Sequence, residues 1–195
     1  LVVVVVGLWF TLLRGPGLLP LGLLGIGLIV LYTRFLTRSA LLCLLSPGVA
    51  FGPVMVLGVY YALTGQYGLT PLLASLVPLF LVSNLLLMNQ FPDREADASV
   101  GRRHLLIRAG PRAGVLVFGL FTLACYAVLL AAVLARSLPP VALLGLATIP
   151  LAWLVCRGLW RHSADIPRLV PHMAQNVVLC LTTPLLLSLG LALGG

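Results

Sequence analysis

The sequence predicts an all-α protein, a polytopic bundle of transmembrane helices that forms one domain over residues 1–195. Composition is the first reason, because 61% of the 195 residues are hydrophobic and only 8% are charged, whereas soluble domains carry about a quarter charged residues. The second reason is that apolar runs of about 20 residues, long enough to cross a bilayer as a helix, recur along the chain. These runs are continuous and do not alternate, which argues against transmembrane strands.

Seven apolar segments follow one another along the sequence. The second is short and rich in glycine, and the third is interrupted by Pro47 and Pro53. Gly48 and Gly52 form a G-x-x-x-G spacing, which favours close packing of helices. The basic stretch 157–171, before the last segment, is a candidate to lie along the membrane surface. The predicted bounds are 1–13, 18–32, 40–63, 69–88, 113–135, 141–155 and 173–193.

The charge distribution predicts the orientation in the membrane. All twelve basic residues are arginines; ten follow the second, fourth and sixth segments, and two follow the first and fifth. Because basic residues collect in cytoplasmic loops, the ten are predicted to face the cytoplasm. The membrane is expected to be a prokaryotic plasma membrane. Arginines in short loops form no solvated basic face, so a nucleic-acid partner is not expected. The four cysteines lie in or beside apolar runs without C-x-x-C spacing and are interpreted as small core residues.

The polar stretch 89–110 interrupts the hydrocarbon. It contains three of the four acidic residues of the chain, Asp93, Glu95 and Asp97. Asn89, Asp93 and Asp97 are spaced four apart, so a helix extending from the fourth segment would place them on one face, with Glu95 elsewhere. Pro92 lies among them and is expected to begin or kink that helix.

Two carboxylates one turn apart, without His or Cys beside them, suit a hard cation such as Mg²⁺. Magnesium usually takes one or two protein carboxylates and completes its shell with water and substrate phosphate. Four nearby arginines would supply donors for phosphate oxygens. Together these features predict a pyrophosphate site; the same charges could instead form a solvated loop with internal ion pairs. The arginines are Arg94, Arg102, Arg103 and Arg108.

The full string N-x-x-x-D-x-x-x-D-x-x-x-G from Asn89 to Gly101, followed by basic residues, closely resembles the second aspartate-rich motif of the UbiA superfamily of intramembrane prenyltransferases. A second match is the segment from Gly58 to Gly65, which is similar to the G-x-Y-Y-x-x-T-G segment of the dihydroxynaphthoate prenyltransferases of menaquinone synthesis. The dipeptide Tyr32-Thr33 also matches this subfamily. The resemblance extends over residues 1–195 and implies the last seven of nine helices.

Three positions depart from the subfamily pattern. Arg102 replaces its usual Lys, His104 replaces Thr, and Gln90 replaces a second Asn. The first aspartate-rich motif of the family is missing, because no Asp or Glu occurs before Asp93. The chain also begins with Leu and a run of valines, without a basic n-region, which does not resemble a signal peptide. We therefore expect a fragment that lacks two helices and is inactive by itself.

The resemblance implies a defined reaction and defined roles. A polyprenyl group would pass from a prenyl pyrophosphate to an aromatic acceptor, dihydroxynaphthoate first among several, in quinone biosynthesis. Asp93 and Asp97 would be the catalytic carboxylates that hold Mg²⁺, and Asn89 and the arginines would bind and orient pyrophosphate. His104 would either touch substrate phosphate or cap the loop. Tyr60 and Tyr61 would either shield the allylic cation or anchor helix ends at the interface.

Rival functions are a non-enzymatic transporter with a cation-binding acidic loop, a diverged and inactive prenyltransferase relative, and a CDP-alcohol phosphotransferase. The transporter predicts acidic residues inside the spans, and none is present there. The D-x-x-D-G-x-x-A-R string of the phosphotransferases is also missing. Asn84 and Asn176, inside apolar segments, would either bond between helices or line a cavity.

Overall fold

A computed structural model of the protein describes residues 2–32 and 35–194, and every regular element in these residues is helical. The elements are α1 (Val2–Arg14), α2 (Leu18–Tyr32), η1 (Leu36–Arg38), α3 (Ala40–Val49), η2 (Ala50–Val54), α4 (Met55–Thr64), α5 (Leu69–Ser99), α6 (Leu105–Leu134), η3 (Pro140–Thr148), α7 (Ile149–His162) and α8 (Ile166–Gly194). The predicted all-α membrane bundle is confirmed.

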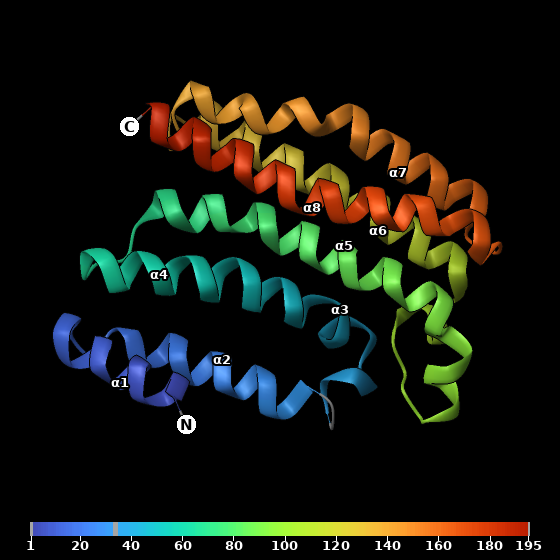
Figure 1. The fold of residues 1–195 in the computed structure, drawn as a ribbon, viewed down its shortest axis with the longest axis horizontal. Coiled ribbons are helices and arrows are strands. Elements are labelled where there is room, and N and C mark those ends of the chain that lie inside the picture. Colours follow the sequence, from blue (N-terminus) through green and yellow to red (C-terminus); the bar gives the residue numbers. More distant parts are fainter. Residues whose placement is uncertain (1, 33–34, 195) are drawn as a thin grey trace.

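Five continuous helical stretches are long and apolar enough to cross a membrane. They are Ala40–Thr64, Leu69–Ser99, Leu105–Leu134, Pro140–His162 and Ile166–Gly194. The two remaining predicted segments form α1 and α2, which are shorter apolar helices of 13 and 15 residues. Neither contains a buried residue, and Figure 1 shows them at one edge of the bundle.

The long helix α5 lies in the middle of the structure, between α3 and α4 on one side and α6, α7 and α8 on the other (Figure 1). Two clusters of buried apolar side chains surround it. One includes Val77 and Leu81 in the first half of α5. The other includes Leu87, Met88 and Phe91 near its end. Both halves of α5 are therefore fixed by packing on two sides.

The G-x-x-x-G spacing lies where α3 and η2 cross α5. A side chain at Gly48 would collide with Ser83 and with the backbone of Leu79, and one at Gly52 would meet the backbone of Ser75. Both glycines are buried. The predicted close packing is confirmed, and it brings the third span against the helix that carries the acidic residues.

The third span remains helical through both of its prolines. Pro47 lies inside α3, and Pro53 lies inside a π-helical turn, η2, that joins α3 to α4. A proline removes one N–H from the hydrogen-bond ladder, and a local π turn is one way in which a helix accommodates that loss. The predicted interruption is therefore a distortion within one continuous span.

The two polar stretches are mostly helical and do not form long loops, because they belong to the ends of α5 and α7 and to the start of α8. Helix α5 runs past Pro92 to Ser99 without a break, so this proline neither begins nor ends it. The basic stretch 157–171 is not a separate element, because α7 extends to His162 and α8 begins at Ile166. The backbone carbonyl of Asp165 accepts the Leu169 N–H (3.0 Å), and its side chain accepts the Arg168 N–H (3.3 Å), which starts α8 at this turn.

Polar side chains inside the bundle bond between helices. Asn84 of α5 donates from Nδ2 to the Phe118 carbonyl and to Thr122 Oγ1 of α6, both at 3.0 Å. Thr148 lies 2.8 Å from Thr183 and 2.9 Å from Tyr126, oxygen to oxygen. Of the two interpretations of Asn84, the interhelical bond is confirmed. Asn176 is buried, and its Nδ2 has no partner in the described part of the chain.

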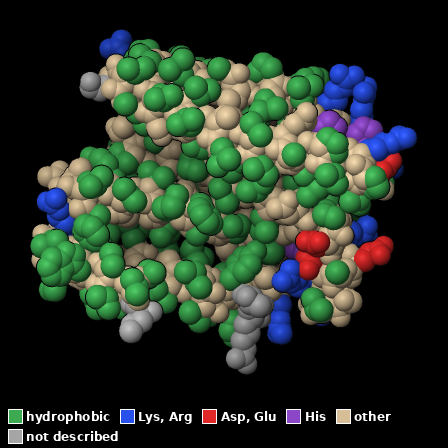
Figure 2. All heavy atoms as spheres, in the orientation of Figure 1, with side chains coloured by type: hydrophobic (Ala, Val, Ile, Leu, Met, Phe, Trp, Pro, Cys, Tyr) green, Lys and Arg blue, Asp and Glu red, His purple; other side chains and the backbone are tan. Residues whose placement is uncertain are grey.

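Charged side chains gather at one end of the helices. Figure 2 shows acidic, histidine and most basic side chains at the right-hand end, with the apolar surface between the two ends. The opposite end holds Arg14, which closes α1, and Arg136, which follows α6. The predicted division of the arginines between two ends is thus present in the structure, apart from Arg34, which lies outside the described residues.

Candidate functional site

A small polar cavity of about 60 Å³ lies at the charged end of α5. Asn89, Asp93 and Asp97 all line it, so the predicted common face of the helix is observed. The remaining lining residues come from α2, η1, α3, α5 and the α5–α6 connection. They are Tyr32, Thr37, Cys43, Leu86, Gln90, Arg102 and His104.

The length of α5 carries this face out of the apolar layer. Its 31 residues span roughly 46 Å, whereas the hydrocarbon core of a bilayer is about 30 Å thick. The apolar part from Leu69 to Met88 matches the thickness of the core, so the following turns extend to the membrane surface. Asp93 and Asp97 can therefore meet a charged ligand without entering the hydrocarbon.

The end of α5 folds Arg102 back toward Asp97. Gly101 has a φ of +79°, a left-handed conformation that glycine adopts readily. Its N–H bonds to the Ala98 carbonyl, and the Arg102 N–H bonds to the Asp97 carbonyl, both at 3.1 Å. This pair of bonds is the Schellman arrangement, which reverses the chain direction. It explains why a glycine follows the second aspartate by four residues.

Asp97 is the anchored carboxylate of the site. Its Oδ1 accepts a hydrogen bond from Arg102 Nη1 at 2.8 Å. Its Oδ2 lies 3.2 Å from His104 Nε2, although these two atoms are not aligned for a hydrogen bond. Only 12% of the Asp97 side chain is exposed, compared with 44% of the Arg102 side chain. Arginine therefore neutralises a largely buried carboxylate.

Asp93 is the free carboxylate. It is exposed, and none of the ion pairs among the described residues involves it. Asn89, one turn before it, is also exposed and offers both an amide donor and a carbonyl oxygen. The site thus combines one fixed carboxylate with one that remains available to a cation or to a ligand.

His104 is almost completely buried, with 1% of its side chain exposed. Burial lowers the pKa of its imidazole, and the carboxylate of Asp97 only partly opposes this effect. A neutral imidazole is therefore expected at pH 7. The backbone carbonyl of His104 accepts the N–H groups of Ile107 and Arg108 at 3.1 Å. His104 therefore lies directly before α6 and also lines the cavity.

Three of the four arginines predicted to contact phosphate, Arg94, Arg103 and Arg108, do not line this cavity. Arg94 faces a separate pocket of about 360 Å³, between the end of α5 and the α7–α8 turn, together with Glu95. Arg103 has an exposed side chain, and its backbone N–H donates to the Thr37 carbonyl at 3.1 Å. Arg103 thus ties the α5–α6 connection to η1 through its backbone.

Tyr60 and Tyr61 lie at the opposite end of the bundle. The Tyr60 ring contacts Gly68, directly before α5, and Asp93 is 25 residues later, or roughly 37 Å along a helix. Tyr61 is buried against Gly17 and packs on the Tyr67 ring, with 4.9 Å between ring centroids. The structure therefore contradicts a cation-shielding role beside Asp93, and α4 uses these tyrosines to contact neighbouring segments.

The sequence did not predict that Tyr32, Thr37, Cys43 and Gln90 also belong to the cavity wall. Gln90 is 5% exposed and donates from Nε2 to the Cys43 sulfur at 3.5 Å, while its Oε1 has no partner in the described chain. The Tyr32 hydroxyl lies 3.9 Å from the same sulfur. Cys43 is therefore a buried core residue that also contacts two polar side chains of the cavity wall. The polarity of Gln90, next to Asn89 at the end of an apolar segment, was the available signal.

The chemistry of the donors agrees with a magnesium ion held jointly with a ligand. No group of three or more His, Cys, Asp or Glu side chains that could enclose a metal occurs among the described residues. Magnesium does not need such an enclosure, because it keeps several waters and is usually bound by one or two carboxylates plus substrate phosphates. Asp93 and Asp97, with an amide oxygen available from Asn89, fit this mode.

Comparison with known families identifies the family of the chain. A sequence model of the UbiA prenyltransferase family matches residues 1–175. The chain belongs to the UbiA prenyltransferase family. No curated protein and no solved structure matches the chain significantly.

Membership of the UbiA family gives the site its chemical class. UbiA proteins are membrane-embedded prenyltransferases that use prenyl diphosphates and aromatic acceptors. The five long apolar helices agree with an integral membrane protein. Asn89, Asp93 and Asp97 all fall within the matched residues 1–175.

Proposed function

We propose that this UbiA protein transfers a polyprenyl group from a prenyl pyrophosphate to dihydroxynaphthoate, as a step of menaquinone biosynthesis. The observation that carries the proposal is the single face of α5 on which Asn89, Asp93 and Asp97 line one cavity. The similarity of the segment from Gly58 to Gly65 to the dihydroxynaphthoate subfamily supports this acceptor over other aromatic rings.

Four residues of the cavity have a task in this proposal. Asp93 and Asp97 would hold Mg²⁺, which when bound neutralises charge that develops on the departing pyrophosphate. Arg102 holds the Asp97 carboxylate in position through the 2.8 Å bond. The Asn89 amide would donate to a phosphate oxygen and orient it. A preorganised arrangement of this kind favours the separated charges of the transition state.

The reaction balances without a redox partner. The bond between the allylic carbon and the pyrophosphate oxygen breaks, and its electron pair leaves with pyrophosphate. An electron-rich ring carbon of the acceptor then forms a carbon–carbon bond to the allylic carbon. The attacked ring carbon then loses a proton, or loses carbon dioxide if it carries the carboxylate; the electron pair of the broken bond returns to the ring and restores its aromaticity.

An apolar groove beside the cavity fits the prenyl chain. The groove has a volume of about 330 Å³ and shares Tyr32 with the polar cavity. Its other lining residues belong to α2, α3 and η2 and are Leu28, Ile29, Ser46, Pro47 and Ala50. A substrate with a charged head in the cavity could thus place its hydrocarbon chain in this groove. The bias of the arginines supports a cytoplasmic location for the head.

Ligand binding tests the proposal directly. The purified chain in detergent would be titrated with a non-hydrolysable prenyl thiolodiphosphate in the presence of Mg²⁺. Asp93→Asn and Asp97→Asn are each expected to weaken binding at least about tenfold, because each removes a charged partner. Glu95→Gln is the matched control, since Glu95 lies on the same helix but faces another pocket. Equal affinity of all three variants would refute the site.

A second candidate is a diverged relative that binds prenyl pyrophosphate without transferring it. The specific observation behind it is that residues 1–195 contain one acidic motif, around Asp93 and Asp97, whereas the resemblance implies two motifs that share the metal. In that case residues 1–195 would bind the donor but would not turn it over. Prenyl transfer to dihydroxynaphthoate by this chain alone would contradict the second candidate and would support the enzyme.

A further inference from the structure

Helix α7 presents a continuous exposed stripe outside the cavity and the groove. The buried residues of α7 face the bundle; they are Ala152, Val155, Gly158 and Leu159. The opposite face repeats every three or four residues, as one face of a helix must. From the middle of the bundle to its charged end, the stripe consists of Ile149, Pro150, Trp153, Leu154, Arg157, Trp160 and Arg161.

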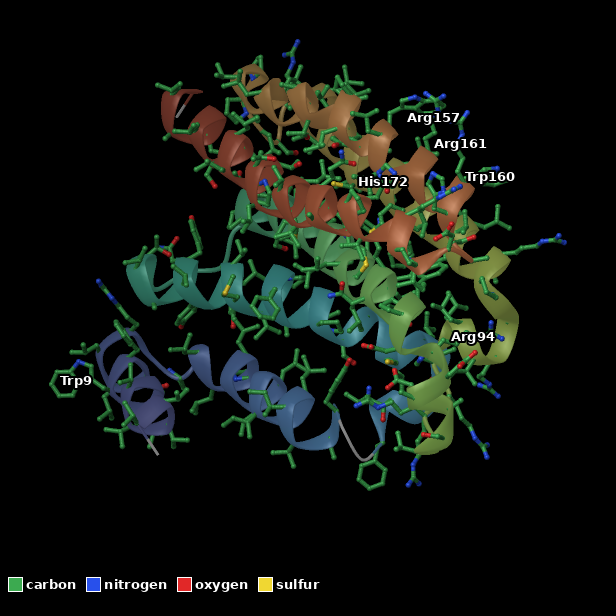
Figure 3. All side chains as sticks on the ribbon, turned by 45° about the vertical axis from the view of Figure 1, so that its right-hand side comes forward. Trp9, Arg94, Arg157, Trp160, Arg161 and His172 are labelled. Carbon is green, nitrogen blue, oxygen red and sulfur yellow. The ribbon has the colours of Figure 1, made fainter. Side chains whose placement is uncertain are left out.

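The stripe changes character along its length. Its first part is apolar, and Trp153 is 67% exposed. Its last part carries two arginines around Trp160, which is 68% exposed. Figure 3 shows Arg157, Trp160 and Arg161 together at the end of α7, apart from Arg94. The apolar first part of the stripe matches the acyl chains of a lipid in one leaflet, and the cationic, aromatic last part matches its headgroup.

The two arginines of the stripe have no acidic partner. The ion pairs among the described residues involve Asp97 and Asp165, and neither reaches Arg157 or Arg161. Glu95 faces the pocket beside the α7–α8 turn. Two guanidinium groups one helical turn apart therefore remain available for an anion, and each can bind a phosphate through two parallel hydrogen bonds.

The end of α7 is held firmly against α8. The His172 ring fills the space above Gly158, where any side chain would collide with it. It also stacks on His162, with 5.8 Å between ring centroids and 6° between planes, and bonds through Nδ1 to Gln175 Oε1 at 2.8 Å. Arg157 and Arg161 thus project from a fixed helix, which reduces the entropy that a bound ligand would cost.

We propose that this stripe of α7 is a binding site for an anionic phospholipid. Arg157 and Arg161 hold the phosphate of the headgroup, Trp160 lies at the interface, and an acyl chain packs along Trp153 and Leu154. The apolar continuation of the stripe favours a lipid over a soluble phosphate or a polar macromolecule, because only a lipid uses both parts. The charge of the pair favours an anionic headgroup over a zwitterionic one.

Tryptophan fluorescence can test this site on the intact chain. The chain has three tryptophans, so Trp9→Phe with Trp153→Phe leaves Trp160 as the only one. This variant would be reconstituted into vesicles in which either phosphatidylglycerol or phosphatidylcholine carries bromine, at equal mole fractions. Brominated phosphatidylglycerol is expected to quench Trp160 more strongly than brominated phosphatidylcholine. Each arginine should raise the affinity for phosphatidylglycerol relative to phosphatidylcholine roughly fivefold or more.

Two further variants make the result specific. Arg157→Gln with Arg161→Gln is expected to abolish the preference, whereas Arg108→Gln with Arg112→Gln, which removes the same charge from α6, should retain it. Trp9, labelled at the far end in Figure 3, serves as the only tryptophan in a reference variant and should show no preference. Equal quenching by both lipids, or a preference that survives loss of Arg157 and Arg161, would overturn the proposal. Competition by millimolar inorganic phosphate would also overturn it, because it would indicate a soluble-anion site.

Discussion

Arg102 bonds to Asp97 twice, once through its backbone and once through its side chain. The backbone N–H reaches the Asp97 carbonyl at 3.1 Å, and Nη1 reaches Oδ1 at 2.8 Å. The first bond belongs to the end of α5, and the second belongs to the cavity. The structure that terminates the helix therefore also sets the position of a proposed metal ligand.

Loss of the Arg102 guanidinium should weaken ligand binding without unfolding the protein. Arg102→Gln removes the charged partner of Asp97, and such outer partners of metal ligands typically affect metal affinity about 10- to 100-fold. Titration with Mg²⁺ and a prenyl thiolodiphosphate measures this loss. Arg103→Gln provides the comparison, because the Arg103 side chain is exposed and lies outside the cavity. If Arg103→Gln weakened binding as much as Arg102→Gln, general charge loss would explain both.

The glycine that ends α5 should be sensitive to a single methyl group. Gly101→Ala forces alanine into a conformation with φ near +79°, at a cost of about 1 kcal/mol. No atom lies within 4 Å of the added Cβ, so the effect is conformational and not steric. We expect a lower Tm in detergent together with weaker donor binding.

Gly119→Ala is the matched control for Gly101→Ala. Gly119 also has open space around its Cβ position, but it lies inside α6 and has no positive φ. Its substitution should leave the Tm unchanged or raise it slightly, because alanine is the better helix former. A similar Tm for the two variants would show that the left-handed conformation of Gly101 contributes nothing measurable.

Sequence periodicity was enough to predict which face of α5 lines the cavity. Asn89, Asp93 and Asp97 recur every four residues, and a helix has no other way to arrange that spacing. The return of Arg102 was not predictable from periodicity, since it depends on the left-handed residue Gly101. The positions of the arginines that follow Gly101 were unpredictable for the same reason, because the bend at this glycine brings Arg102, but not Arg103, to the cavity.

Of the two roles considered for Tyr60 and Tyr61, the sequence already contained the information that disfavours cation shielding. A connection of only four residues, 65–68, joins α4 to α5, so the tyrosines must lie near the start of α5. The acidic residues come at its other end, and a rise of 1.5 Å per residue already separates the two groups. A shared family segment indicated relatedness, but it carried no information about distance.

The crossing of the third span and α5 should depend on its two glycines. Gly48→Ala would place a methyl group against Ser83 and the Leu79 backbone, and overpacking of this kind typically costs about 1–3 kcal/mol. We expect a clear fall in Tm. Gly58→Ala, in α4 of the same span, meets no atom within 4 Å and should leave the Tm nearly unchanged. Equal stability of both variants would mean that the helices can separate at this crossing without loss.

Burial of His104 should make stability depend on pH in the absence of metal. Histidine in the unfolded chain titrates near pH 6.5, whereas burial lowers the pKa of His104 in the folded protein. Below pH 6.5 the unfolded state therefore binds more protons, and the free energy of unfolding decreases as the pH falls. Above that value the contribution of His104 is constant. Thermal unfolding in EDTA between pH 5 and pH 8 should show a Tm that falls on the acid side.

His104→Asn tests whether this one imidazole is responsible. The substitution removes the titrating group, so the fall in Tm between pH 6.5 and pH 5 should become smaller than in the parent chain. His162→Asn is the matched control, because it removes a histidine from the same end of the bundle and leaves the buried one in place. The two variants must therefore differ in slope on the acid side, since only His104 is almost completely enclosed. Parallel curves for the two would show that His104 is protonated as easily in the folded protein as in the unfolded chain.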